Sequence, residues 1–184
     1  KMRIIAGLHR GRRLKPVKGD KIRPTTDRVR EAIFSILSDR VIDAAVLDLF
    51  AGSGALGIEA LSRGAELAVF VDKDFDAVSL IKANLNLLDE TSRSTVIKGD
   101  VLRVCERLGK QSKRFNIIFA DPPYKSDIHE NVISTILDNE LLAAQGIIVY
   151  ETRPDYQFDD SSLGRFREAK IRTYGDTKVW FLAK

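Results

Sequence analysis

The stretch Val46-Leu47-Asp48-Leu49-Phe50-Ala51-Gly52-Ser53-Gly54-Ala55-Leu56-Gly57 decides the fold class of this 184-residue chain. An apolar run with an acid near its end leads into closely spaced glycines and then into a second apolar run, which predicts a strand, a tight turn and a helix. Glycine permits such a turn and lets a ligand approach the backbone closely. The same pattern also fits a plain strand-to-helix turn, so the residues around it must decide between a structural and a ligand-binding loop.

The strand-then-helix unit repeats along the chain. The predicted strands are 45–49, 67–71, 95–97, 116–120 and 147–150, and the predicted helices between them are 54–63, 75–88, 101–108 and 128–137. Strands that are apolar throughout are typical of a parallel sheet covered by helices on both faces. Gly175-Asp176 separates two closing apolar runs and predicts an antiparallel hairpin. We therefore expect a doubly wound α/β fold, Rossmann-like, with a mostly parallel seven-stranded sheet.

Composition excludes several classes of protein. The chain is 44% hydrophobic and 30% charged, with 12 Gly, 5 Pro and one cysteine, Cys105. It has no apolar run near the roughly 20 residues that a membrane span needs, and one cysteine cannot form an internal disulfide framework or a zinc cluster with thiol ligands. We expect a soluble cytoplasmic protein without a membrane segment or a metal site, with Cys105 and Trp180 in the core.

Positive charge is concentrated at the amino-terminal end. Residues 1–30 hold eleven Lys or Arg against two Asp, a net of +9 in a chain whose total is +4, so the other residues carry −5. Such a stretch suits nucleic-acid phosphates, although most charge runs are only solvated surface. Gly7 and Gly11 predict a short hairpin over residues 2–14, and the Thr26-Asp27 region predicts the start of a helix. We expect residues 1–40 to form this extension and residues 41–184 the main domain.

Acidic residues follow the predicted strands. Asp72 lies 24 positions after Asp48, where its carboxylate can accept hydrogen bonds from both hydroxyls of a ribose. A dinucleotide loop would need Gly-x-Gly-x-x-Gly facing a pyrophosphate, which Asp48 would repel. S-adenosylmethionine carries no phosphate, and its cationic groups suit Asp48. Asp100, followed by Val101, can accept from an adenine amine and can also cap the next helix.

The tetrapeptide Asp121-Pro122-Pro123-Tyr124 follows the fourth predicted strand. Two prolines fix the backbone, so the Pro122 carbonyl and the Asp121 carboxylate can both accept from one exocyclic amine of a base. Holding both hydrogens out of the ring plane restores the lone pair on nitrogen and directs it at a methyl donor. Tyr124 would stack on the base, a contact worth about 1 to 3 kcal/mol. A rigid turn would explain the prolines but not the acid and aromatic residue beside them.

These residues resemble class I S-adenosylmethionine-dependent methyltransferases, and within them amino-group methylases of the Asn/Asp-Pro-Pro-Tyr/Phe type. A closer resemblance rests on the segments 3–7, 9–14, 23–32 and 174–177, which read RIIAG, HRGRRL, RPTTDRVREA and YGDT. They are similar to the bacterial 16S rRNA guanine-N2 methyltransferase family that modifies guanine 966. The resemblance spans nearly the whole chain.

The resemblance implies methyl transfer from S-adenosylmethionine to guanine N2 in 16S rRNA, within the small ribosomal subunit or its assembly intermediate, by a monomer that releases S-adenosylhomocysteine. It implies cofactor contacts at Asp48, Gly52, Gly54, Asp72, Asp100 and Val101, catalytic residues Asp121, Pro122 and Tyr124, and RNA contacts at Arg10, Arg12, Arg13 and Arg23. His9 has no metal partners in the sequence, and we expect it on the RNA-binding face. The family often carries glutamate where this chain has Asp72. Arg23, Thr25 and Thr26 could close over the donor or grip phosphate.

Three alternatives stay open at this point. A DNA adenine or cytosine amino-methyltransferase uses the same tetrapeptide, but usually has a sizeable target-recognition domain, and only about 40 residues lie outside the fold here. A protein-glutamine methylase faces the same problem of a delocalised amide lone pair, although the basic segment favours RNA. A non-catalytic RNA-binding assembly factor could retain the scaffold, since a fold does not imply a function.

Overall fold

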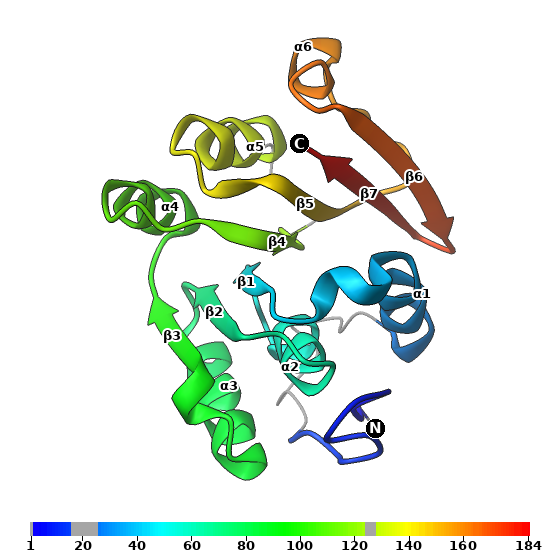
Figure 1. The fold of residues 1–184 in the computed structure, drawn as a ribbon. Helices are drawn as coiled ribbons and strands as arrows, with labels where there is room; N and C mark the ends of the chain where they lie inside the picture. The colour runs from blue at the N-terminus through cyan, green and yellow to red at the C-terminus, as the bar shows by residue number, and fades with distance from the viewer. Residues whose placement is uncertain (1, 16–25, 124–127) are drawn as a thin grey trace.

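A computed structural model describes residues 2–15, 26–123 and 128–184 of the chain (Figure 1). Fifteen elements succeed one another: α1 (Asp27–Leu37), η1 (Ser38–Val41), β1 (Ala45–Leu49), α2 (Ala55–Ser62), β2 (Leu67–Asp72), α3 (Phe75–Leu88), η2 (Thr91–Arg93), β3 (Ser94–Lys98), α4 (Val101–Lys110), β4 (Phe115–Ala120), α5 (His129–Asp138), β5 (Leu142–Thr152), α6 (Asp160–Leu163), β6 (Glu168–Tyr174) and β7 (Thr177–Ala183). No helix within these ranges is long and apolar enough to cross a membrane.

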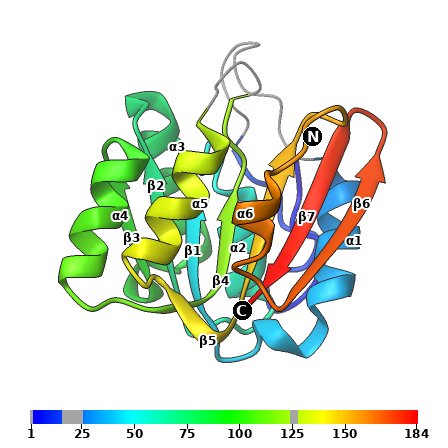
Figure 2. The ribbon, with the colours of Figure 1, turned by 90° about the horizontal axis from the view of Figure 1, so that it is seen from above.

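The seven strands form one sheet in the order β3-β2-β1-β4-β5-β7-β6. The strands from β3 to β5 in this order are all parallel, whereas β7 runs antiparallel to both β5 and β6. Figure 2 shows the β6–β7 hairpin at one side of the sheet and β3 at the other. The predicted α/β class, the seven strands and the closing antiparallel hairpin are confirmed.

Helices cover both faces of the sheet, and each face has its own apolar core. On one face α1, α2 and α3 pack over Ile117 and Phe119 of β4, and on the other α4 and α5 pack over Ile118 and Ala120 (Figure 1). Alternate residues of one buried strand thus serve opposite layers, which is why the strands are apolar throughout. Cys105 and Trp180 are buried in the second core, as predicted.

The chain order reverses between β1 and β4, which are sequence-distant neighbours in the sheet. In open parallel sheets, ligands bind in the crevice outside the carboxyl ends of the strands at this point. Leu49 and Ala120, the last residues of β1 and β4, lie in register with each other. The segments that follow them, which contain the glycine loop and Asp121, therefore leave the sheet side by side.

β5 is longer than the apolar run 147–150 predicts. It begins at Leu142, but Ala144 and Gln145 are exposed, and the β4–β5 register shifts between Phe115 and Ile117. An irregular, half-solvated strand start lacks the continuous hydrophobicity that identifies a buried strand. The sequence pattern therefore predicts only part of the buried stretch of β5, residues 147–150.

The amino-terminal segment, residues 2–15, is a hairpin-like loop with a single antiparallel bridge between Arg3 and Arg13. The N–H groups of Ile5 and Ala6 do not extend the ladder, because they donate to the buried Glu59 carboxylate of α2, at 2.9 and 3.0 Å. The predicted hairpin is thus shortened by its attachment to α2. Its two arms remain joined, since Ile4 N–H donates to the Arg12 carbonyl at 3.0 Å.

Candidate active site at the carboxyl edge of the sheet

The loop after β1 has a backbone that few residue types adopt. Phe50, Gly52 and Gly54 all have positive φ, at 56°, 53° and 74°. Gly54 precedes α2, and a Cβ atom there would come within 3.0 Å of the Ile81 Cγ1 atom on α3. The absence of a side chain therefore lets α2 begin close to α3, with the loop backbone facing the crevice.

Asp72 ties this loop to the next one. Its Oδ2 atom accepts a hydrogen bond from Gly52 N–H at 2.8 Å, and its Oδ1 atom accepts from Asp74 N–H at 2.9 Å. Asp72 is half-buried, and each carboxylate oxygen has a further lone pair for a ligand hydroxyl. The residue expected to bind ribose thus also holds the glycine loop in place.

Asp48 is buried at the centre of the sheet edge. Its Oδ2 atom accepts from Gly57 N–H in α2 at 2.9 Å. Burial raises the pKa of Asp48 to about 8, the Gly57 hydrogen bond opposes this rise, and the charges of Asp121 and Asp72 add to it. Because their charges affect the pKa of Asp48, Asp72 and Asp121 must lie near it at the carboxyl edge of the sheet.

Asp100 caps α4. Its Oδ1 atom accepts from Arg103 N–H at 3.1 Å, while Val101 is buried beneath it. Gly99 N–H donates to the Asp72 carbonyl at 2.9 Å, so the loop after β3 is attached to the end of β2. The helix-capping role predicted for Asp100 is confirmed, and its exposed carboxylate stands at the edge expected to hold adenine.

Asp121 and Pro122 directly follow the last residue of β4. Asp121 is half-buried, and burial raises the pKa of its carboxyl to about 7. Within residues 2–15, 26–123 and 128–184, no group donates a hydrogen bond to this carboxylate. Pro122 is buried and Pro123 is exposed. The predicted base-stacking residue, Tyr124, lies outside the described residues.

An aromatic cluster behind this segment was not evident from the sequence. Tyr150 of β5 lies in register with Ala120, and its hydroxyl lies 3.1 Å from His129 Nδ1 of α5. The pKa of Tyr150 is raised mainly by burial, and the Asp121 charge contributes. Tyr156 lies against His129 with ring centroids 4.2 Å apart. The closely spaced aromatic residues Tyr150, Tyr156 and Phe158 are the signal in the sequence that could have indicated this cluster.

The basic residues of the amino-terminal segment divide into exposed and anchored ones. Arg10, Arg12 and Arg13 are exposed, and Arg12 Nη2 donates to the Leu87 carbonyl at 2.8 Å. His9, expected on the same face, is instead buried, with Nε2 at 2.7 Å from Glu90 Oε1. The prediction that His9 lies on the exposed RNA-binding face is therefore wrong. Its hydrogen bond to Glu90 compensates for the burial of the imidazole.

Two further predictions concern the segment before α1. Thr26 is the helix cap, since its Oγ1 atom accepts from Val29 N–H at 3.3 Å. Arg23 and Thr25 lie outside the described residues. Asp27, the first residue of α1, instead pairs with the buried Arg30 at 2.9 Å. Arg30 also donates to the Arg3 carbonyl at 2.5 Å, so α1 and the amino-terminal segment are fastened together.

The arrangement suits S-adenosylmethionine better than a pyrophosphate ligand. Carboxylates at the ends of β1, β2 and β4 lie around the glycine loop, and carboxylates attract cations and accept from hydroxyl and amine groups. Within the described part of the chain, no group of three or more His, Cys, Asp or Glu side chains could hold a metal ion. The charge and the acceptor chemistry of the crevice thus fit the methyl donor.

Comparison with protein families gives a match over residues 2–183 to the family described as "Conserved hypothetical protein 95". This chain belongs to that family. Among the proteins similar to this chain is a Bacillus subtilis protein named "Putative rRNA methyltransferase YlbH", 40% identical over 97% of this chain and 96% of its own length. "Ribosomal RNA small subunit methyltransferase D" of Escherichia coli K12 is 38% identical over 82% of this chain and 74% of its own.

Solved structures of similar proteins share the fold of this chain. "Putative methyltransferase yhhF from Escherichia coli" has a TM-score of 0.85 and 34% identity, covering 100% of this chain and 97% of that one. A Thermus thermophilus "16S rRNA N2 G1207 methyltransferase (RsmC)" with AdoMet and guanosine has a TM-score of 0.73 at 22% identity, over 91% of this chain and 44% of that one, and shows the shared fold. The class I methyltransferase fold is therefore confirmed.

Proposed function

We propose that this protein transfers a methyl group from S-adenosylmethionine to the exocyclic N2 of a guanine in 16S rRNA, with guanine 966 as the target. The observation that carries the proposal is the position of Asp121 and Pro122 directly after β4, beside the glycine loop and the carboxylates of Asp48 and Asp72. Relatives over most of the chain are named as small-subunit rRNA methyltransferases, which supports the substrate class.

In this proposal the donor crevice is built by backbone and carboxylate groups. Gly52 and Gly54 give close access to the loop, Asp72 binds the ribose hydroxyls, and Asp100 with Val101 borders the adenine. The positive charge of the donor would lower the pKa of Asp48 from about 8, so that Asp48 loses its proton and balances that charge. When bound, S-adenosylmethionine supplies a methyl group on a sulfonium centre. The hydrogen bonds that Asp72 already accepts keep the loop in one geometry, so little ordering is left for binding to complete.

Asp121 and Pro122 then hold the guanine amine. The carboxylate and the proline carbonyl each accept one N–H, which turns the nitrogen lone pair toward the methyl carbon. As the nitrogen–carbon bond forms and the sulfur–carbon bond breaks, nitrogen loses a proton to Asp121 or to water. A pKa of about 7 suits Asp121 to this role, because a general base works best near the operating pH. Tyr124 would stack on the guanine.

The amino-terminal extension, residues 1–40, would hold the rRNA. Arg10, Arg12 and Arg13 are exposed on a segment that begins beside the glycine loop, since Ser53 Oγ lies 3.5 Å from Met2 Sδ. Arg23 would add a further phosphate contact. Residues 41–184 would form the catalytic domain, and we propose that the protein acts as a cytoplasmic monomer on the small subunit or its assembly intermediate.

The decisive experiment uses small ribosomal subunits from cells that lack this enzyme. The protein is incubated with isotope-labelled S-adenosylmethionine and the label is mapped by nucleoside mass spectrometry. N2-methylguanosine at the expected position supports donor, acceptor atom and substrate together. Label in ribosomal protein instead of rRNA, or in DNA when DNA is offered in a parallel reaction, would overturn the substrate. Donor binding without any label would favour an assembly factor.

A second experiment tests the basic segment. Replacing Arg10, Arg12 and Arg13 together with alanine is expected to weaken rRNA binding and to lower the salt dependence of that binding, because each phosphate contact releases counterions. Donor affinity is measured in parallel as the control. Unchanged rRNA affinity in this variant would contradict the role of the segment.

A further inference from the structure

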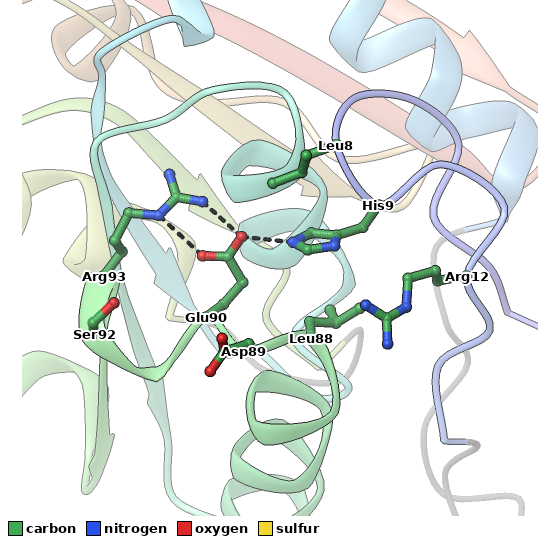
Figure 3. A pocket seen from close by; sticks show the side chains of 8 residues that line it. All are labelled: Leu8, His9, Arg12, Leu88, Asp89, Glu90, Ser92 and Arg93. Atoms are coloured by element: carbon green, nitrogen blue, oxygen red, sulfur yellow. Dashed lines mark hydrogen bonds and ion pairs between the residues drawn. The ribbon is translucent and has the colours of Figure 1, made fainter.

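A second hollow lies at the opposite edge of the sheet from the donor crevice. It is a pocket of about 510 Å³ between the amino-terminal segment and the connection from α3 to β3 (Figure 3). The residues that line it are Leu8, His9, Arg12, Leu88, Asp89, Glu90, Ser92 and Arg93. Ser92 and Arg93 directly precede β3, which starts at Ser94, so the pocket lies at the amino end of this strand. Asp100, at the donor crevice, follows the carboxyl end of the same strand.

The floor of the pocket is a fixed, internally neutralised network. Glu90 is buried and lies between His9, at 2.7 Å, and Arg93, whose Nη2 and Nε atoms donate to it at 2.6 and 3.0 Å (Figure 3). Arg93 also donates to the Ala65 carbonyl at 2.7 Å. These groups satisfy one another, so the floor is preorganised and its charges are already paired.

The rim carries exposed groups of another kind. Leu8 is 79% exposed and offers an apolar surface at the mouth of the pocket. The Arg12 guanidinium is held in place by its hydrogen bond to the Leu87 carbonyl, at 2.8 Å, and it retains further N–H groups. Asp89 and Ser92 are exposed and supply a carboxylate and a hydroxyl.

The charge of the lining indicates the type of ligand. Arg12 and Arg93 are matched by Asp89 and Glu90, so a phosphate would gain little and would meet the Asp89 carboxylate. A neutral, planar group with N–H donors fits better, because it can pack on Leu8 and the Arg12 plane while Asp89 and Ser92 accept from its edge. The volume lies within the range of small-ligand sites.

We propose that this pocket binds a second, unmodified nucleobase of the rRNA, remote from the methylated guanine. The inference rests on the proposed function and assigns it an additional subsite. The amino-terminal segment starts beside the glycine loop at Ser53 and reaches the pocket at Leu8, following α2, whose eight residues span about 12 Å. Exposed Arg10 and Arg13 on this path would hold the intervening phosphates.

The first test is Leu8→Glu, which changes an exposed side chain and places a negative charge at the rim. We expect the KM for the small subunit to rise at least tenfold, with kcat and the donor Kd within twofold of wild type. Ile171→Glu is the matched control, because Ile171 is 41% exposed on β6 at the other side of the sheet. An unchanged KM for Leu8→Glu, or an equal rise for Ile171→Glu, would overturn the subsite.

A second test identifies the occupant. Cys105 is only 1% exposed, so Leu8→Cys gives the chain one accessible thiol for a photo-crosslinker, with Ile171→Cys as control. Crosslinks from position 8 to a few defined rRNA nucleotides, other than the methylated guanine, are expected. Crosslinks to ribosomal protein, or a scattered pattern matching the control, would overturn the proposal. If Leu8→Cys crosslinks to defined rRNA nucleotides while neither it nor wild type methylates the rRNA, the proposed function fails and the subsite stands.

Discussion

The carboxylates of the donor side and of the acceptor side are held in different ways. Asp48, Asp72 and Asp100 each accept a hydrogen bond from a backbone N–H, of Gly57, Gly52 and Arg103 respectively. Asp121 is positioned by the end of β4 and the prolines after it, and burial raises its pKa. Asp48, Asp72 and Asp100 thus also build the loops around them. Within residues 2–15, 26–123 and 128–184 no backbone N–H donates to Asp121 in this way, which would leave its lone pairs for the proposed substrate.

This difference separates two consequences of removing a charge. Loss of a donor-side carboxylate also releases a loop or a helix cap, so binding and stability change together. Loss of the Asp121 carboxylate leaves the backbone of the crevice as it is, so the chemical step should change alone. Substitutions of Asp121, Asp72 and Asp100 test this distinction.

Asp121→Asn should have the largest effect. It keeps the size of the side chain but removes the negative charge and one acceptor, so kcat should fall by about 10²- to 10³-fold, the usual cost of removing one electrostatic contact to a transition state. Single-turnover methylation gives the rate, and calorimetry gives the donor Kd, which should stay within twofold. A large loss of donor affinity would mean that Asp121 belongs to the donor side.

The pH dependence of turnover should report the same carboxylate. Because burial raises the Asp121 pKa to about 7, the ionised form that accepts from the amine dominates only above that pH, and kcat should fall about tenfold per pH unit below it. The limb should disappear in Asp121→Asn. A limb that persists there would assign the titration to another group, with Asp48, pKa about 8, as the first alternative.

Asp72→Asn should act mainly on the donor. The amide keeps one acceptor but loses the charge, so one of the bonds from Gly52 and Asp74 is weakened together with the ribose contact. A hydrogen bond to a charged group contributes about 1.5 to 3 kcal/mol, which predicts a donor Kd about 10- to 100-fold higher. The rate at saturating donor should change less than in Asp121→Asn, and the reverse ranking would contradict the comparison.

Asp100 should show the smallest effect, because its carboxylate is exposed. Asp100→Ala removes the cap of α4 and should lower the free energy of unfolding by about 1 kcal/mol, whereas Asp100→Ser keeps a capping oxygen and should lose less. Both variants lose the carboxylate, so the donor Kd should rise equally in the two, by less than about tenfold. Urea unfolding and donor titration of the pair separate capping from binding.

Local sequence patterns predicted the parts of the fold that depend on neighbours in the chain. The bounds of β1 and α3 match the predicted ranges, because each is set by an apolar run next to a turn or cap. The carboxyl-edge gathering of Asp48, Asp72 and Asp121 also followed, since parallel strands bring their ends to one side. Which backbone groups those acids accept from depends on loop geometry and could not be predicted.

The sequence did not reveal contacts between distant segments. Glu59 holds Ile5 and Ala6 across more than 50 positions, and His9 meets Glu90 across 81. Neither Glu59, inside an apolar helix, nor His9, among arginines, has neighbours in the sequence that predict its partner. The sequence therefore predicted a short basic hairpin but not its attachments, to Glu59 and Ser62 of α2 and to Glu90 after α3.

The attachment of the amino-terminal segment also has a consequence for synthesis on the ribosome. The segment is translated before its anchors, because Glu59 and Ser62 lie in α2 and Glu90 follows α3. If the chain folds during translation, the amino-terminal segment therefore cannot pack on its anchors until α2 and α3 have formed. The surface that would bind rRNA is completed only when the helix that starts at the donor loop is in place.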